Sequence, residues 1–275
     1  MLEPNANAII WPLEAIWQAV EPALPGFTCE VLPTIGSTNT ELMRRFKAGQ
    51  LEPTLLVAEQ QTAGRGRMGR QWHSQRTDSL MFSLGLMLTP DDWSGLSLAV
   101  GCALADSLDP ANVAERRIAL KWPNDLWLVE GRAERKLAGI LVETGLVESQ
   151  RYAVIGVGIN VRANAAVIDV AAQSGMTIAP GYLQDLQPAS DVAQTLLRVV
   201  QPLVQTVQAF VLSGFKPYQT RFAQRDVLFG RDVGLSDGTH GRAAGVSETG
   251  ALLVHTSAGM KAITSSEVSV RPCSD

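Results

Sequence analysis

Four apolar, strand-like runs follow one another in the middle of the chain, at 117–122, 126–129, 136–144 and 152–161. The links between them are short and carry polar residues or glycine. Such links can join antiparallel neighbours, whereas parallel neighbours need a crossover connection of about a dozen residues or more. Earlier runs at 54–58 and 79–88 have the same texture. The sequence therefore predicts a mixed, mainly antiparallel sheet.

Helices are expected beside this sheet. Thr38 followed three residues later by Glu41 is a capping-box pattern and predicts a helix over 39–48. The run 93–108 is typical of a mostly buried helix. Across 191–212 the apolar residues recur every three or four positions, which is typical of a long amphipathic helix packed on a sheet. The predicted fold class is α+β, with the sheet backed by helices.

The sequence pattern changes after residue 226. Short strand-like runs at 231–235, 242–247, 251–256 and 260–263 are separated by glycine-bearing turns, a spacing typical of a small β-barrel. We therefore expect two domains, a catalytic one over residues 1–226 and a small C-terminal one over 227–275. The stretch 163–189 carries no motif, and we interpret it as an irregular or weakly helical connection.

The composition limits the function classes. Charged residues make up only 18% of the chain and the net charge is −4, which argues against general nucleic-acid binding, because that affinity depends on many cations. Cys29, Cys102 and Cys273 are far apart, which favours a reducing compartment over a disulfide framework or a zinc site. The N-terminus lacks the pattern of a secretory signal, and the run 96–105 is about half of the roughly 20 residues that a membrane span needs. We expect a cytoplasmic protein without a membrane partner.

The most informative segment is the glycine and arginine loop from Gly64 to Arg70, GRGRMGR, between two predicted strands. It resembles a dinucleotide-binding fingerprint, but no helix is expected to start there and no acid follows at the required distance. It also approaches a P-loop, but Arg70 and Gln71 replace the required Lys and Ser or Thr. The glycines would let backbone amides approach an anion, and the arginines carry forked cationic donors. The loop is thus expected to close over a phosphate or a carboxylate, the alternative being a solvated surface turn.

Other segments add polar groups, each with an ordinary structural alternative. The segment 121–125, KWPND, can aim a cation, an amide and a carboxylate at one point, or can simply be an Asx-turn. Lys136 opens an apolar strand, where its ammonium faces either the same anion or solvent. The segment 156–160, GVGIN, leaves room for a flat ligand against the backbone, unless the glycines mark a bulge or a tight contact. The segment 37–39, STN, can be no more than a helix cap.

Taken together, in this order, the segments STN, QTAGRGRMGR, KWPND, KLAG and GVGIN resemble a biotin-protein ligase, of the monofunctional type without an N-terminal DNA-binding domain. The resemblance runs from about Ser37 to Asn160, with a plausible continuation to the end of the chain. It implies the class II synthetase-like fold of biotin and lipoate ligases, with an SH3-like C-terminal barrel. The implied reaction joins biotin to AMP and then transfers biotin to a lysine of a carrier protein.

The resemblance also implies roles for single residues. The implied biotin contacts are Ser37, Thr38, Asn39, Gln61, Gly64, Arg65, Gly66, Arg67, Lys136 and Gly139. The implied ATP contacts are Arg67, Arg70, Trp72, Lys121, Asn124 and Asn160, with Trp72 facing the adenine. The residues expected to be catalytic are Lys136, Arg67, Lys121 and Asp125, and Asp125 is either a magnesium ligand or the group that activates the carrier lysine.

This chemistry suits the residue types. Joining a carboxylate to the α-phosphate of ATP brings anions together without a protein nucleophile, so cations and positioning should supply most of the catalysis. ATP, Mg²⁺ and biotin are expected as substrates or activator, with no tightly bound prosthetic group. The expected partner is the biotin carboxyl carrier protein of acetyl-CoA carboxylase, without nucleic acid, and the chain is expected to be a monomer or a homodimer. Two alternatives stay open: a lipoate or octanoate ligase or transferase, and a non-catalytic biotin or nucleotide sensor that acts as a DNA-binding regulator.

Overall fold

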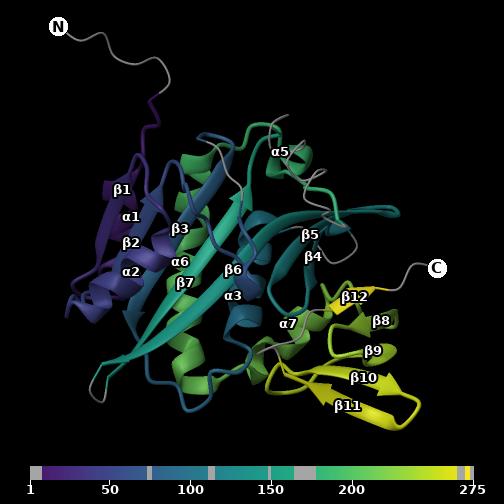
Figure 1. The fold of residues 1–275 in the computed structure, drawn as a ribbon. Helices are drawn as coiled ribbons and strands as arrows, with labels where there is room; N and C mark the ends of the chain where they lie inside the picture. Colours follow the sequence, from purple (N-terminus) through teal and green to yellow (C-terminus); the bar gives the residue numbers. More distant parts are fainter. Residues whose placement is uncertain are drawn as a thin grey trace, which may run out of the picture.

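The computed structural model describes residues 8–72, 76–110, 115–147, 150–163, 178–264 and 270–272. A seven-stranded sheet crosses the larger part of the molecule in the order β1-β2-β3-β7-β6-β5-β4 (Figure 1). Its strands are β1 (Thr28–Leu32), β2 (Thr54–Ala58), β3 (Ser79–Met87), β4 (Ile118–Lys121), β5 (Asp125–Glu130), β6 (Ala133–Val147) and β7 (Gln150–Asn160). Only the β1–β2 pair among these is parallel. The predicted mixed, mainly antiparallel sheet is confirmed.

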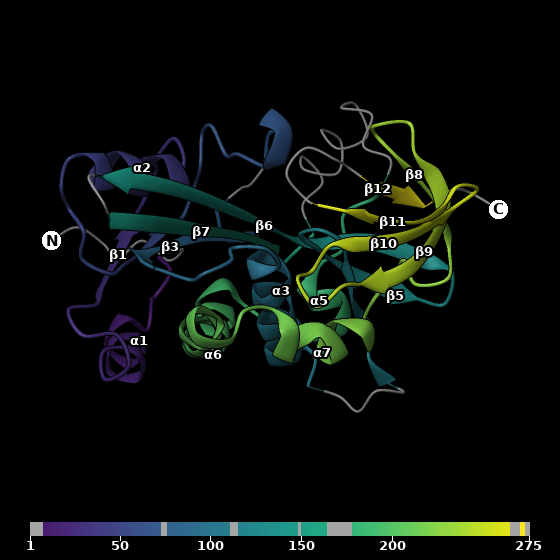
Figure 2. The same ribbon diagram turned by 90° about the horizontal axis from the view of Figure 1, so that it is seen from below.

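Helices cover both faces of this sheet. The helices α1 (Leu13–Val20), α6 (Val192–Ser213) and α3 (Leu96–Leu108) lie side by side on one face, and α2 (Thr38–Lys47) lies on the other (Figure 2). Nearly all of α3 is buried, because it packs between α6 and the strands β4 to β6. The short elements are η1 (Arg67–Gly69), α5 (Leu183–Leu186), η3 (Lys216–Tyr218) and α7 (Gln219–Ala223).

The helix α6 is apolar enough to be mistaken for a membrane span. By length and composition it passes that test, but half of its most apolar window is buried inside the protein. Asp191 caps its first turn by accepting the amide of Gln194 at 2.8 Å, and Gly214 follows its last residue. Val199, Leu203 and Val207 are fully buried, and α6 packs against α3 and α1. The long amphipathic helix expected from the sequence is therefore a core helix.

The C-terminal segment forms a second, separate sheet, all antiparallel, in the order β11-β10-β9-β8-β12. Its strands are β8 (Asp232–Leu235), β9 (His240–Val246), β10 (Leu252–Thr256), β11 (Gly259–Ile263) and β12 (Val270–Pro272). This antiparallel unit lies where the sequence predicts a small C-terminal β-domain, and residues 265–269 between β11 and β12 lie outside the described part of the chain. It shares one hydrophobic core with the larger sheet.

Candidate active site

One row of residues crosses five strands in register and carries the reactive groups. Met81 on β3 pairs with Gly158 on β7, Gly158 with Gly139 on β6, Gly139 with Asp125 on β5, and Asp125 with Lys121 on β4. The two glycines leave a shelf without side chains in the middle of the row. The shelf ends at a carboxylate and an ammonium. A flat molecule lying on the glycines would therefore direct one end at these charges.

The indole of Trp72 covers this shelf. A Cβ atom built on Gly158 would lie 2.5 Å from Cε2 of Trp72, and one on Gly139 would lie 3.2 Å from its Cζ3. The Nε1 of Trp72 is buried and has no hydrogen-bond partner in the described part of the chain. The sequence predicts room for a flat ligand at these glycines, and the structure fills that room with an aromatic side chain from the glycine and arginine loop.

The loop folds back on itself to bring Trp72 to the shelf. The amide of Gly66 donates to the carbonyl of Arg70 at 2.7 Å, and the amide of Trp72 donates to the carbonyl of Gly64 at 2.9 Å. A side chain on Gly64 would clash with the Trp72 carbonyl, at 2.4 Å from its Cβ, so this closure requires glycine there. Met68 has a left-handed backbone, with φ of 56°, at the apex of the turn.

A buried polar cluster lies beside the shelf, at the start of α2. Ser37 caps the helix, and its hydroxyl accepts the amide of Thr40 at 3.4 Å. The amide and the hydroxyl of Thr38 donate to Oε1 of Gln61 at 2.7 and 3.2 Å. Ser83 on β3, which is fully buried, donates to Oδ1 of Asn39 at 2.6 Å. The sequence interpretation did not include Ser83, although it is a polar residue in an apolar strand.

Asn39 lies against Gly156 as Trp72 lies against Gly158. A Cβ on Gly156 would come within 2.1 Å of Oδ1 of Asn39, so the absence of a side chain on this strand makes space for the amide. Nδ2 of Asn39 donates to the carbonyl of Leu141 at 3.2 Å. The two glycines of GVGIN thus make room for the side chains of Asn39 and Trp72.

The cations of three segments meet at the other end of the row. Nζ of Lys136 forms an ion pair with Oδ1 of Asp125 at 2.7 Å and lies 5.7 Å from the ring centroid of Trp72. Nη1 of Arg67 donates to Oδ1 of Asn124 at 3.4 Å. Burial lowers the pKa of Lys121 to about 8; the Asp125 carboxylate opposes that shift, and neighbouring cations including Lys136 reinforce it. Burial also lowers the pKa of Arg67.

Backbone contacts hold the KWPND turn in place. Nδ2 of Asn124 donates to the carbonyl of Ile140 at 2.8 Å, and the amide of Ile140 donates back to the Asn124 carbonyl at 3.0 Å. The hydroxyl of Ser97 on α3 donates to the Pro123 carbonyl at 2.9 Å. Asn160, at the end of β7, donates to the Lys136 carbonyl at 3.2 Å. Asn124 and Asn160 therefore orient the segments that carry Asp125 and Lys136.

The structure brings all the sequence-predicted site residues into one region, on the face of the sheet that α2 covers. The helix start and Gln61 form the polar cluster, Gly64 and Gly66 close the loop, and Gly139 forms part of the shelf. Arg65 reaches Glu143 on β6, at 3.3 Å from its Oε1, a contact that the sequence does not reveal. Arg70 is exposed at the edge, and its charge acts on Lys121 and Arg67.

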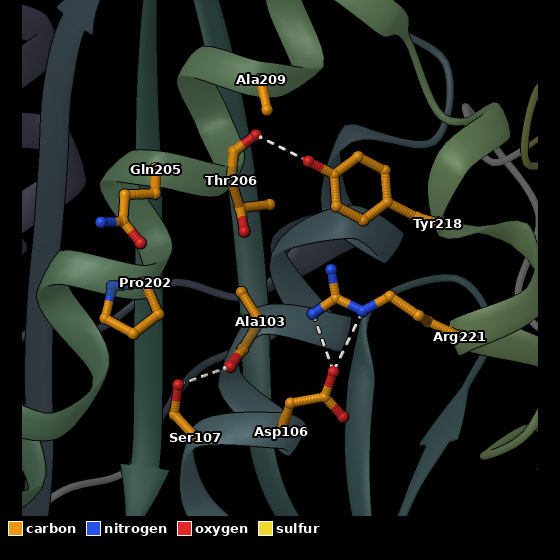
Figure 3. Close-up of a pocket in the computed structure, with 9 residues that line it drawn as sticks. All are labelled: Ala103, Asp106, Ser107, Pro202, Gln205, Thr206, Ala209, Tyr218 and Arg221. Carbon is orange, nitrogen blue, oxygen red and sulfur yellow. Dashed lines mark hydrogen bonds and ion pairs between the residues drawn. The ribbon is translucent and has the colours of Figure 1, made fainter.

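A hollow of about 360 Å³ lies elsewhere, between α3, α6 and α7 (Figure 3). The helices that line it cover the opposite face of the sheet from α2 (Figure 2). Its polar side chains bond within the protein: Arg221 binds Asp106 at 2.7 Å, and the hydroxyl of Tyr218 donates to the Thr206 carbonyl at 3.1 Å. None of the site residues above lines this hollow, which is therefore not the candidate active site.

Comparisons with known proteins match both parts of the chain. Residues 31–160 match the model of the Biotin/lipoate A/B protein ligase family, and residues 227–271 match the Biotin protein ligase C terminal domain. The Bifunctional ligase/repressor BirA of Escherichia coli is 34% identical over 255 residues, covering 90% of this chain and 75% of that protein. The Biotin--[acetyl-CoA-carboxylase] ligase of Paracoccus denitrificans is 30% identical, covering 86% of this chain and 98% of that protein.

A solved structure extends the likeness to three dimensions. The biotin protein ligase from Aquifex aeolicus in complex with biotin and ATP superposes with a TM-score of 0.71 and 29% sequence identity. The match covers 90% of this chain and 99% of that chain, so it includes the small C-terminal sheet as well as the large one.

Proposed function

The chain belongs to the biotin protein ligase family, with biotin--[acetyl-CoA-carboxylase] ligase activity, and we propose that it forms biotinyl-AMP on the row that ends at Asp125 and Lys121. The observation that carries this assignment is the register of the row, because it aligns two glycines with a carboxylate and an ammonium. Biotin, which has a planar ureido group and a carboxylate tail, matches such a shelf when Trp72 moves from it.

The first step joins two anions. A carboxylate oxygen of biotin attacks the α-phosphorus of ATP, and the bond from that phosphorus to the bridging oxygen breaks to release pyrophosphate. Lys136 contacts the biotin carboxylate and then the α-phosphate, while Lys121, Arg67 and Arg70 face the phosphates. Fixed cations in a partly buried site stabilise the charge of the transition state more than they would in water. No covalent intermediate with the protein is needed.

The second step uses the mixed anhydride. The amine of the carrier lysine attacks the biotinyl carbonyl carbon, AMP leaves, and the nitrogen loses a proton. Asp125, which lies in the row and forms an ion pair with Lys136, is assigned either the acceptance of this proton or the binding of magnesium described below. The polar cluster of Ser37, Thr38, Asn39 and Gln61 offers hydroxyl and amide groups to the ureido ring of biotin.

The side chains of this site can hold Mg²⁺ only when the phosphates of ATP supply further ligands. Among the residues that the structure describes there is no group of three or more His, Cys, Asp or Glu side chains that could hold a metal ion. Mg²⁺ in nucleotide sites is commonly held by one or two carboxylates plus substrate phosphates, so a single carboxylate suffices. Asp125 would hold the ion with the phosphates of ATP, and the ion would neutralise phosphate charge.

Other assignments follow from the same proposal. Trp72 faces the adenine, and Asn124 and Asn160 line the nucleotide side of the site. Residues 1–226 form the catalytic domain and residues 227–275 the C-terminal domain. The acceptor is the biotin carboxyl carrier protein of acetyl-CoA carboxylase in the cytoplasm. The net charge of −4 favours function without nucleic acid. The proposed assembly is a monomer or a homodimer.

The test is a labelling reaction with the full chain, biotin, MgATP and a biotin carboxyl carrier fragment. The mass of the carrier should rise by one biotinyl group, and omission of ATP should abolish the gain. A gain of lipoyl mass in a parallel reaction with lipoate, without a gain from biotin, would select the lipoate ligase. Ligand binding without any transfer would favour a sensor, and salt-dependent retention on DNA would point to a regulator.

A further inference from the structure

The carboxylate of Glu143 on β6 contacts two parts of the site at once. Its Oε2 accepts Nδ2 of Asn39 at 2.9 Å, and its Oε1 forms an ion pair with Nη1 of Arg65 at 3.3 Å. The Glu143 side chain is 25% exposed and that of Arg65 is 52% exposed. Glu143 therefore links the buried polar cluster to the glycine and arginine loop.

The contact with Asn39 sets the orientation of an amide. Nδ2 of Asn39 donates to both Glu143 and the Leu141 carbonyl, while Oδ1 accepts from the hydroxyl of Ser83. A carboxylate only accepts hydrogen bonds, so it selects the amide nitrogen and excludes the flipped rotamer. Because Gly156 has no side chain, Oδ1 packs directly against the β7 backbone, where a Cβ would lie 2.1 Å away.

The contact with Arg65 holds the loop at a second point. Further along the chain, Nε of Arg76 forms an ion pair at 2.7 Å with Glu59, whose side chain is 9% exposed. The Arg65 pair is longer and more exposed, so solvent screens it and it can break and reform. A reversible tether at this position suits a loop that must release Trp72 from the shelf to admit a ligand and then close again.

We propose that Glu143 is a positioning residue for biotin activation: it orients Asn39 and docks Arg65, so that the loop stays closed over biotin and biotinyl-AMP. This inference rests on the proposed function, since it assigns Asn39 and Arg65 to the biotin side of the same site. Glu143 itself does not touch the reacting atoms.

The test uses Glu143→Gln, which loses the charge facing Arg65 but can still accept a hydrogen bond from Asn39. Biotin affinity is measured by calorimetry, and the release of preformed biotinyl-AMP by rapid filtration. We expect about two- to five-fold weaker biotin binding and faster release, as for the loss of a partly exposed ion pair, with an unchanged melting temperature. The matched control is Glu41→Gln, which removes an acid paired with Arg44 and Arg45 on α2 and should leave both values unchanged.

A double substitution separates the two contacts. In an Arg65→Gln background, Glu143→Gln should have no further effect on release, whereas Glu143→Ala should still weaken biotin binding through Asn39. Additive effects of Glu143→Gln and Arg65→Gln, or parental behaviour of Glu143→Gln, would overturn the inference. A parent chain that fails to label the carrier would overturn the proposed function and this inference with it. Normal labelling by the parent together with normal release by Glu143→Gln would overturn the inference alone.

Discussion

Lys121 is a partly buried cation, and burial disfavours its charged form. Burial lowers its pKa to about 8, from an ordinary value of 10.5, so the ammonium remains largely charged at neutral pH. Between pH 8 and 10.5 Lys121 is protonated in a larger fraction of unfolded chains than of folded chains. The charge of Lys121 therefore lowers the free energy of unfolding in full below about pH 8, and this destabilisation disappears as the pH rises from about 8 to 10.5. A lysine that destabilises the fold in this way is typical of a functional site, here one that binds an anion.

We predict that Lys121→Met stabilises the protein at pH 6.5 and that this gain in melting temperature shrinks at pH 9.5. The same variant should form biotinyl-AMP more slowly, because the phosphates lose a cation. Thermal unfolding at both pH values, with the exposed Lys47→Met as control, measures the effect. A pH-independent difference between Lys121→Met and the parent would mean that the charge of Lys121 is not the destabilising factor.

Lys136 differs from Lys121 because its ammonium forms an ion pair with the carboxylate of Asp125. Its ammonium lies 2.7 Å from Asp125, so Lys136→Ala removes an ion pair and the proposed contact to the biotin carboxylate. A charge-assisted contact is worth about 1.5–3 kcal/mol, which predicts adenylate formation slowed by about ten- to a hundred-fold. Single-turnover formation of biotinyl-AMP is the measurement. An unchanged rate in a variant with parental melting temperature would remove Lys136 from the site.

At the scale of elements, the glycine and arginine loop connects the two ends of the site. Arg67 donates to Asn124 of the KWPND turn, while Trp72 covers the shelf. We predict that Arg67→Gly lets biotinyl-AMP escape, because the loop loses a cation that faces the phosphate and a contact to the turn. The rate at which biotinyl-AMP leaves the protein should rise by about ten-fold or more, on the order of one charged contact. Arg132→Gly, at an exposed turn between β5 and β6, is the control, and retention of the intermediate equal to the parent would contradict the prediction.

The elements with their own local signal could be predicted from the sequence. β2 coincides with the predicted run 54–58, and α2 begins one residue before the predicted start. α1 and β1 were missed. β1 is half-buried at the edge of the sheet, so its apolar pattern is weak, and among the described strands it pairs with β2 alone, in parallel. α1 was missed although Leu13, Ile16, Trp17 and Val20 recur at helical spacing, a signal that the sequence offers over only two turns.

The same limit applies to the site. The residue types and the motif spacing indicate an anion site at the loop, the turn and Lys136. They do not tell that Trp72 lies on Gly158 or that Asn39 lies on Gly156, because both contacts depend on the path of the chain across the sheet. Glu143 was missed because no local pattern distinguishes a polar site residue on a partly exposed strand from a surface one, whereas Ser83 could have been found as a polar residue within an apolar strand.

At the scale of the whole molecule, the two sheets meet at the turn between β9 and β10. The buried indole of Trp122 donates to the Gly250 carbonyl at 3.0 Å. Trp122 belongs to the KWPND turn, so a contact from the C-terminal sheet supports the segment that carries Asp125. Nε2 of Gln219 on α7 donates to the Val246 carbonyl at 2.8 Å and adds a second link. The C-terminal sheet is therefore part of the frame of the site.

Gly250 tests this connection, because its backbone is left-handed, with φ of +80°, and a Cβ there would lie 2.8 Å from Cα of Gly95. We predict that Gly250→Ala lowers stability by about 1–3 kcal/mol and also slows adenylate formation, since the displaced turn no longer supports Trp122. Gly238→Ala is a matched control: its φ is +82° and a Cβ there meets nothing within 4 Å, so it carries the same backbone strain without the clash. Chemical denaturation and single-turnover kinetics on both variants separate the two effects. Equal losses of stability with parental kinetics would show that strain alone acts at Gly250, and the C-terminal sheet would then have no part in holding the KWPND turn.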